Sequence, residues 1–399
     1  MGTTSLTGDM ASAINDRIDS LSGTLLSVSH EIHANPELAF QEHHAAALLC
    51  DTLEAQGLTP ARGIFTLETA FEATLPTQGD GPTVAILAEY DALPGIGHSC
   101  GHNLIATAAL GATLGLQAIA DQLPGQVRLL GTPAEEKGGG KELMARAGAF
   151  DGVDAAMMIH PAGVNLSTMP CICVAEVEVI YHGRSAHASA MPHKGVNALD
   201  GLLLAYQAIS NLRQHIRDEE RIHGIVTEGG LAPNIVPDRA VGNFYVRAAS
   251  EKALAALKPR VQACFEAGAT GSGAEVEVKW ANVDYLDLNT NWPLAARFQS
   301  HGESLGREFL SLKGLGGAGS TDMGNVSYLV PAIHPMLASA PANVVIHNPE
   351  FAKWAGSEMG DAAALDGAKA LALTTAEFLL DRALQQEVHK AFNVSKGLS

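Results

Sequence analysis

Residues 83–116 read TVAILAEYDALPGIGHSCGHNLIATAALGATLGL, and they decide the fold that we expect. The segment TVAILAEYDALPG is a short apolar run that ends in acidic residues and Pro-Gly, which is typical of a buried parallel strand. GHNLIATAALGATLGLQAIADQL (101–123), which continues beyond this stretch, has the composition of an Ala/Leu helix. The turn between them places His98, Cys100 and His102 at every second position. The stretch therefore predicts a strand, a turn rich in potential metal ligands, and a helix.

Two further apolar strands end in polar groups. QVRLLGTPAEEKGGG (126–140) ends in Glu135 and Glu136, and VDAAMMIHP (153–161) ends in His160. In open α/β sheets ligands gather outside the carboxyl ends of the strands. We therefore expect these side chains to converge on the turn that carries Cys100 and His102.

The pattern changes near Cys173. ICVAEVEVIYHG and AEVEVKW alternate apolar and polar residues, as half-exposed strands do. With a helix and two more strand-like segments between them, the order is the βαββαβ of a ferredoxin-like antiparallel sheet. A chain of 399 residues also exceeds the ~250–300 at which a single core stops growing. We expect an α/β domain with a mostly parallel sheet flanked by helices, built from 1–173 and 288–399, and a smaller inserted domain at 174–287.

The composition disfavours several classes of partner. A formal charge of −18 at pH 7 argues against nucleic acid and against an anionic membrane surface, because both attract Lys and Arg. We find no apolar run of the ~18–20 residues that span a bilayer, and the first residues lack the pattern of a signal peptide. Five cysteines without a regular spacing give no disulfide framework. We expect a cytoplasmic protein without a nucleic-acid or membrane partner.

Cysteine, histidine and glutamate point to metal chemistry. Thiolate and imidazole are preferred ligands of zinc. Adjacent side chains on extended chain point opposite ways, so one of Glu135 and Glu136 can bind metal while the other acts as a general base. Each residue alone has an ordinary structural explanation, such as an exposed acidic loop or a core histidine. The set as a whole offers more ligands than one tetrahedral zinc needs and fits two metal ions that share a ligand. Its members are Cys100, His102, Glu136, His160 and His347.

The sequence resembles the dinuclear metallopeptidases that include aminoacylases, carboxypeptidase-G-type enzymes and amidohydrolases of amino-acid conjugates. The similarity covers nearly the whole chain, and it is greatest to the branch of aminobenzoyl-glutamate hydrolase subunits and β-alanyl-lysine dipeptidases. It rests on motifs in order: IHANPELAFQE, LAEYDALPGIGHSCGHN, TPAEE, GRSAHASAMPHKGVNAL, GGLAPNIVPD, GSTDMGNVS and HNPEF. The resemblance implies a zinc-peptidase-like catalytic domain, an inserted lid and dimerisation domain, and a homodimer.

The same resemblance assigns roles to single residues. It implies that Cys100, His102, Glu136, His160 and His347 bind two Zn²⁺ or Mn²⁺ ions and that Glu135 is the general base. It implies that His187 reaches a neighbouring subunit's active site and polarises the scissile carbonyl, while Asn234 and Arg247 hold the substrate carboxylate. Asp91 would orient a ligand, and we place His98 in the same outer layer. Asn103 departs from the Asp that is common after the Gly-His pair, which leaves the coupling of that position to the metals open.

The implied activity is hydrolysis of an N-acyl or N-aryl amino acid, or of a small dipeptide, with a free carboxylate. Other functions stay open. An inserted domain can change the substrate without changing the metals, so another amide or carbamoyl bond is an alternative. A metal-stabilised binding subunit without activity is another, although it would not need Glu135. A thiol enzyme that uses Cys100 would need a free thiolate beside a base, and metal removal would activate it.

Overall fold

The computed structural model describes residues 5–313 and 319–397. The described residues form two compact units. Within the described residues, the α/β unit comprises 5–170, 288–313 and 321–397, and the inserted unit comprises 171–287 together with 319–320. One domain therefore interrupts the other along the chain.

The α/β unit is built on a six-stranded mixed sheet with the order β1-β2-β4-β3-β5-β11. From β4 to β11 neighbouring strands are parallel, while β1 and β2 pair antiparallel at one edge. The strands are β1 (Ala61–Arg62), β2 (Phe71–Gly79), β3 (Thr83–Glu89), β4 (Gly125–Thr132), β5 (Ala155–Met157) and β11 (Ala332–Ile333). The parallel part brings the ends of β3 and β4 to the same edge.

The segment 153–161 differs from the single strand that we expected. It is divided into β5, which ends at Met157, and β6 (His160–Ala162). β6 leaves the main sheet and pairs in parallel with β12 (Met336–Ala338). His160 therefore begins a strand of a small second sheet.

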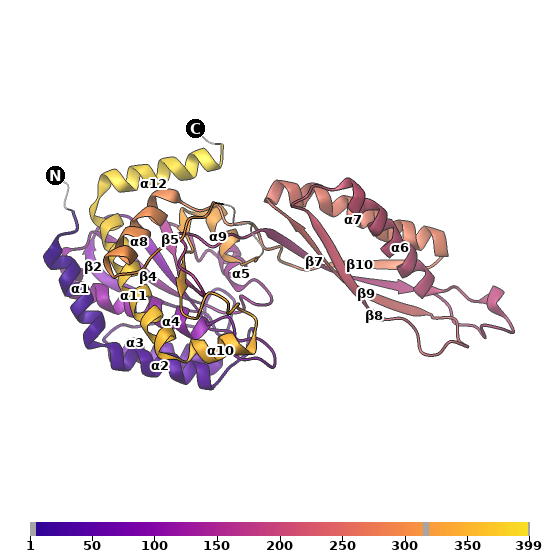
Figure 1. Ribbon diagram of the computed structural model, residues 1–399, viewed down its shortest axis with the longest axis horizontal. Helices are drawn as coiled ribbons and strands as arrows, with labels where there is room; N and C mark the ends of the chain where they lie inside the picture. Colours follow the sequence, from indigo (N-terminus) through magenta and orange to yellow (C-terminus); the bar gives the residue numbers. More distant parts are fainter. Residues whose placement is uncertain (1–4, 314–318, 398–399) are drawn as a thin grey trace. The chain divides into compact units, whose positions relative to one another are not determined.

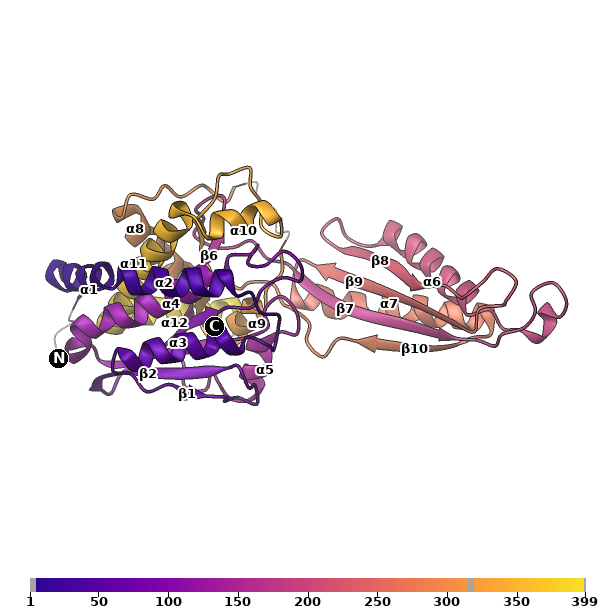
Figure 2. The ribbon, with the colours of Figure 1, turned by 90° about the horizontal axis from the view of Figure 1, so that it is seen from below.

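Apolar side chains of β3 alternate between two cores. Val84 and Ile86 face the larger core, and Ala85 and Leu87 face the smaller one. The larger core is covered by helices at both ends of the chain, as Figures 1 and 2 show. These are α1 (Gly8–Ser20), α2 (Ser22–Ala34), α3 (His43–Ala55), α4 (His102–Leu116), α8 (Trp292–Ser304), α11 (Glu358–Leu380) and α12 (Arg382–Ser395). The smaller core contains α5 (Gly140–Arg146) and α9 (Met323–Leu329), and α10 (Pro349–Ala355) packs on α11.

One helical segment is more apolar than we expected. His102–Gln122, which combines α4 with the 3-10 turn η1 (Gln117–Gln122), has 21 residues and a mean hydropathy of 1.4 over its most apolar window. By length and composition it could cross a membrane, so the expectation that no run is long enough was wrong. In the structure 83% of that window is buried inside the protein. A helix that is apolar all round and buried on all sides is the central helix of a large core.

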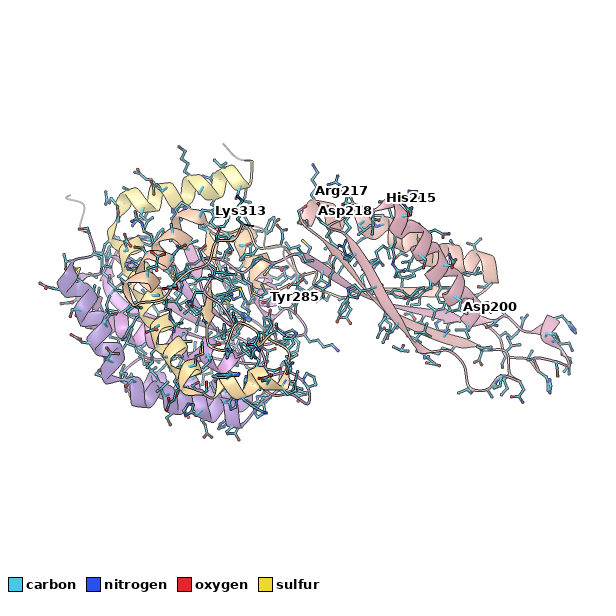
Figure 3. All side chains as sticks on the ribbon, viewed as in Figure 1. Asp200, His215, Arg217, Asp218, Tyr285 and Lys313 are labelled. Carbon is cyan, nitrogen blue, oxygen red and sulfur yellow. The ribbon has the colours of Figure 1, made fainter. Side chains whose placement is uncertain are left out.

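The inserted unit is a four-stranded antiparallel sheet with the order β10-β7-β9-β8. Its elements are β7 (Cys173–His182), α6 (Ala198–Leu212), β8 (Arg221–Glu228), β9 (Arg239–Ala248), α7 (Glu251–Ser272) and β10 (Glu275–Trp280), with short 3-10 turns η2 (Pro192–Lys194) and η3 (Arg213–His215). Both helices pack on one face through Leu202, Phe244 and Phe265. Figure 3 marks the two ends of α6 by Asp200 in its first turn and His215 just after it. The predicted βαββαβ arrangement is confirmed.

Candidate metal centre

The turn after β3 presents Cys100 and His102 to the interior. Gly101 lies between them with φ of 79°, a conformation that glycine adopts without strain. A Cβ at this position would come within 2.9 Å of the Pro161 ring. The close approach allows the turn to pack directly against β6, and α4 begins at His102. Cys100 is 5% exposed and His102 is fully buried.

The Cys100 sulfur lies at the middle of the predicted ligands. Sγ is 3.4 Å from His160 Nε2 and 3.5 Å from His347 Nε2. Ligand atoms of Cys100, His102 and His160 all lie within 4.8 Å of one another, and so do those of Cys100, Glu136 and His347. Two atoms bound ~2.0–2.3 Å from one ion at the tetrahedral angle are ~3.3–3.8 Å apart. The five predicted ligands thus form two groups that share one thiol.

Outer hydrogen bonds turn the buried imidazoles toward this thiol. His102 Nδ1 lies 3.0 Å from Asp91 Oδ1, and His160 Nδ1 lies 2.7 Å from the carbonyl oxygen of Pro161. Both acceptors place the ring proton on Nδ1, so each Nε2 keeps its lone pair for the interior. Asp91 also accepts a hydrogen bond from the backbone N–H of Glu136 through Oδ2, at 2.9 Å. Asp91 therefore lies where a carboxylate that orients ligands was expected.

His347 reaches the group from the segment before α10. Its backbone N–H donates to the carbonyl of Ser99, at 2.9 Å, which ties it to the Cys100 turn. Its φ is 61°, an uncommon value for a residue with a side chain. The side chain is 54% exposed, and Nε2 lies 3.5 Å from Glu136 Oε2. His347 and Glu136 thus form the more accessible half of the site.

Glu135 and Glu136 face His102 from the end of β4. Glu135 Oε2 and Glu136 Oε1 each lie 3.8 Å from His102 Nε2. Burial, with the nearby Glu89 and Glu136 carboxylates, raises the pKa of Glu135 well above its usual value. Burial also opposes the charge of Glu136, but the hydrogen bond to His347 outweighs it and lowers the pKa of Glu136. The pKa values of Glu135 and Glu136 are therefore shifted in opposite directions.

A buried ion-pair network beside the site was not predicted from the sequence. Lys141 is fully buried, and its Nζ lies 2.5 Å from Glu89 Oε2 and 2.7 Å from Asp322 Oδ1. Glu89 Oε1 lies 3.2 Å from His102 Nε2. The sequence contains both partners, because Glu89 ends β3 and Lys141 follows the Gly-rich loop. Only the fold shows that these two residues are in contact.

Two more histidines lie close to the site. His98 is buried, as expected for an outer residue, and its ring lies 6.3 Å from that of His33. Burial lowers the pKa of His98 to about 3. His334, which was not predicted, is fully buried with its ring 5.4 Å from that of His160, and burial holds its pKa well below the usual range. Both rings are therefore neutral packing partners of the site.

Asn103 anchors α4 instead of approaching the ligands. Its side-chain amide donates to Ser29 Oγ and to the carbonyl of Ala355, each at 2.9 Å. These bonds tie the first turn of α4 to α2 and to the end of α10.

The residues present fit divalent metal ions. His102 Nε2 and Glu136 Oε1 are buried, and neither has a hydrogen-bond partner among the described residues. Buried lone pairs that converge without donors need a cation or a bound molecule. One thiolate, three imidazoles and a carboxylate suit zinc in particular, while imidazole and carboxylate also suit manganese.

The predicted lid residues lie in the inserted unit at opposite ends of its sheet. His187 forms a β-bridge with Ile235, and the backbone N–H of Ala188 donates to the carbonyl of Asn234, at 3.0 Å. This places His187 next to Asn234. Arg247 lies near the other end of β9, where the chain enters the unit.

The side chains of His187 and Arg247 are each oriented by hydrogen bonds to neighbouring residues. His187 Nδ1 accepts the backbone N–H of Ala190 at 3.2 Å, so its neutral ring carries the proton on Nε2 and can donate there. Arg247 donates from Nε to His223 Nε2 at 3.3 Å and from Nη1 to Ser320 Oγ at 3.1 Å, and its Cζ lies 5.7 Å from the centre of the Tyr245 ring.

Comparison with known proteins shows which family this chain resembles. Residues 174–271 match the M20 peptidase dimerisation domain. The Xaa-Arg dipeptidase of Mus musculus is 39% identical over 391 residues, which cover 94% of this chain and 90% of the relative. The chain belongs to the M20 peptidase family. The resemblance inferred from the motifs is therefore confirmed.

Two other proteins are also similar to this chain. One of the subunits of the p-aminobenzoyl-glutamate hydrolase of Escherichia coli is 34% identical over 67% of this chain and 60% of its own length. A dinuclear metal-binding M20 peptidase from Bacillus subtilis has the same fold, with a TM-score of 0.67 and 23% identity over 90% of this chain and 99% of its own. As an M20 enzyme, the protein catalyses metal-dependent hydrolysis of amide bonds in dipeptides or N-acyl amino acids.

Proposed function

We propose that this M20 enzyme is a dipeptidase that removes a C-terminal amino acid with a free carboxylate, and that dipeptides with a basic C-terminal residue are its preferred substrates. The site chemistry supports the first part, and the near full-length similarity to an Xaa-Arg dipeptidase supports the second. The observation that carries the proposal is the pair of ligand groups sharing Cys100, with Glu135 beside them.

In this proposal two divalent ions, Zn²⁺ or Mn²⁺, occupy the two groups. The residues that would hold these ions are Cys100, His102, Glu136, His160 and His347. When bound, such ions supply an activated water molecule and polarise the scissile carbonyl. The Cys100 thiolate favours zinc.

The chain's own residues complete the reaction. Glu135, whose pKa is raised by burial and by the nearby carboxylates, accepts a proton from the attacking water and returns it to the departing amine. His187 donates a hydrogen bond from Nε2 to the developing oxyanion. Asn234 and the fixed guanidinium of Arg247 bind the substrate carboxylate.

A homodimer is part of the proposal. The dimerisation domain match and the exposed apolar side chains of the edge strand β8 support it, because Ile225 is 63% and Val226 41% exposed. Light scattering should give twice the monomer mass. We also propose a cytoplasmic location, since all five cysteines lie in the described part and none forms a disulfide.

Mass-spectrometric cleavage of a mixed panel tests the function. The panel contains dipeptides with basic, acidic and neutral C-terminal residues, N-acetyl and N-aminobenzoyl amino acids, and N-carbamoyl amino acids, each with added Mn²⁺ or Zn²⁺ and with chelator. We expect chelator-sensitive release of free Lys or Arg from the basic dipeptides. Cleavage confined to acyl or carbamoyl conjugates would reject the dipeptidase and favour an alternative amide substrate.

A further inference from the structure

Glu42 is a buried carboxylate that the proposed chemistry does not use. It is fully buried. Its Oε1 accepts the backbone N–H groups of Phe40 and Ala134, each at 2.9 Å, and its Oε2 accepts the hydroxyl of Thr69 at 2.9 Å. A carboxylate can only accept hydrogen bonds, so this set of three donors fits the ionised form of Glu42.

The position of Glu42 in its helix does not explain these bonds. Glu42 is the residue that precedes α3, where a side chain commonly caps the helix, but it makes no capping bond. Glu37 does so in its place, because its two oxygens accept the backbone N–H groups of His44 and Ala45, each at 2.9 Å. The Glu42 carboxylate is therefore directed away from its own helix.

Both backbone groups that Glu42 binds belong to residues in left-handed conformation. Phe40 has φ of 64° and Ala134 has φ of 62°. For residues with a Cβ this conformation is unfavourable and persists only where the surroundings hold it. One oxygen atom thus holds two strained residues that are far apart in the sequence.

The held turn is the one that presents the catalytic glutamates. Ala134 directly precedes Glu135, and its carbonyl accepts the N–H of Gly139 at 3.1 Å, which closes the Gly-rich loop after the pair. The Phe40 ring lies against this loop, since a Cβ on Gly138 would come within 2.4 Å of it. Glu136 has a further anchor, the bond from its N–H to Asp91.

We propose that Glu42 is a positioning residue that holds the turn at Ala134 in its left-handed conformation and thereby aims Glu135 at the substrate. The inference rests on the proposed function, in which Glu135 is the general base. Because Asp91 separately anchors Glu136, loss of Glu42 displaces Glu135 more than it displaces the metal ligands.

The same contacts make the turn sensitive to pH. Burial raises the pKa of Glu42 to about 7, against the lowering effect of its hydrogen bonds, and the nearby Asp91 adds to the rise. Tyr90, whose hydroxyl donates to the carbonyl of Thr69, is the other titratable group that faces it. Protonation turns one acceptor oxygen into a donor that faces donors, so the turn is held less well below about pH 7.

The test compares Glu42→Gln with Glu37→Gln as a matched control in the same segment. For Glu42→Gln we expect kcat to fall roughly 10- to 100-fold, the scale of a small misplacement of a catalytic group, with KM and bound metal close to those of the wild type. In the wild type, kcat should fall as the pH drops through about 7, because Glu42 becomes protonated. This part of the pH dependence should be absent in Glu42→Gln. Amide hydrogen exchange should quicken at Phe40 and Ala134. Glu37→Gln should leave kcat and both amides unchanged.

A second substitution separates positioning from general damage. Ala134→Gly removes the strain of the left-handed residue, so adding it to Glu42→Gln should recover most of the lost kcat. No recovery, a kcat of Glu42→Gln equal to that of the wild type, or an equal loss in Glu37→Gln would overturn the inference. If the wild type cleaves no amide, the proposed function fails, and the exchange at Phe40 and Ala134 still decides whether Glu42 holds the turn.

Discussion

Glu135 and Glu136 show how neighbouring residues of one type acquire different chemistry. Glu136 shares a hydrogen bond with His347, which favours its ionised form. Glu135 is surrounded by buried surface and by the Glu89 carboxylate, which favour its protonated form. Two carboxyl groups with opposite shifts are the pattern of an acid-base residue beside a fixed anion. This supports the division of base and ligand that the sequence resemblance implied.

The pair can be separated by one experiment on two isosteric variants. Glu135→Gln should keep both metal ions and lose about 10²–10⁴ in kcat, because general acid-base catalysis contributes that much. Glu136→Gln should lose metal, since a neutral amide replaces a charged ligand. Metal content by elemental mass spectrometry and kcat, measured on the same samples, check both. Loss of metal in Glu135→Gln equal to that in Glu136→Gln would contradict the division.

At the same scale, the sequence predicted site residues that belong to a local motif. It missed residues whose role depends on contacts with distant parts of the chain. Cys100, His102 and Glu136 lie in segments that follow buried strands, where an apolar run followed by ligand-type residues can be recognised. Lys141 and Glu42 have no such context. Their role depends on partners 181 and 92 residues away in the chain, which no local pattern reveals.

At the scale of elements, α4 fixes the place of His102, because the helix that begins there is clamped between α2 and α11. Gly111 makes this packing possible: a Cβ there would lie 2.9 Å from Ala368 Cβ and 3.0 Å from Leu25 Cδ1. The Ala/Leu-rich sequence predicted a helix but could not show which glycine touches which neighbour. In the same way, the apolar run 153–161 could not show that the chain leaves the sheet after Met157.

Substitution of two helical glycines tests this packing. Gly23 in α2 has open space around its Cα, so Gly23→Ala should stabilise the protein by about 0.5–1 kcal/mol through helix propensity. Gly111→Ala gains the same propensity but meets Ala368, and overpacking costs about 1–3 kcal/mol. We expect net destabilisation, measured by urea unfolding, and partial recovery on adding Ala368→Gly. Equal stabilisation by both substitutions would show that α4 is not tightly packed.

At the scale of the whole molecule, the inserted unit places its functional residues too far apart for one site in one chain to use them together. Arg247 is eight residues from Arg239 along β9, which is about 26 Å at the rise of a strand. His187 and Asn234 lie together beyond the Arg239 end, where Val236 bonds to Ala186. This separation supports the proposal that each active site takes Arg247 from one chain and His187 from its partner.

Mixing two inactive variants tests the shared site. Glu135→Gln and His187→Ala homodimers should each be nearly inactive. If His187 acts in the partner's site, a hybrid dimer has one complete site, composed of Glu135 from the His187→Ala chain and His187 from the other. Random exchange of subunits in an equal mixture makes half of the dimers hybrids, so activity should return to about a quarter of the wild type. If His187 acts within its own chain, each hybrid site lacks one group and mixing restores nothing.

A mixture of Glu135→Gln with Arg247→Ala is the matched control for the exchange experiment. Arg247 and Glu135 serve the same site from the same chain in this proposal, so each site of that hybrid lacks one of the two groups. This mixture should therefore remain inactive while the mixture with His187→Ala recovers. Equal recovery in both mixtures would mean that Arg247 also crosses to the partner, and it would contradict the division of the two residues between chains.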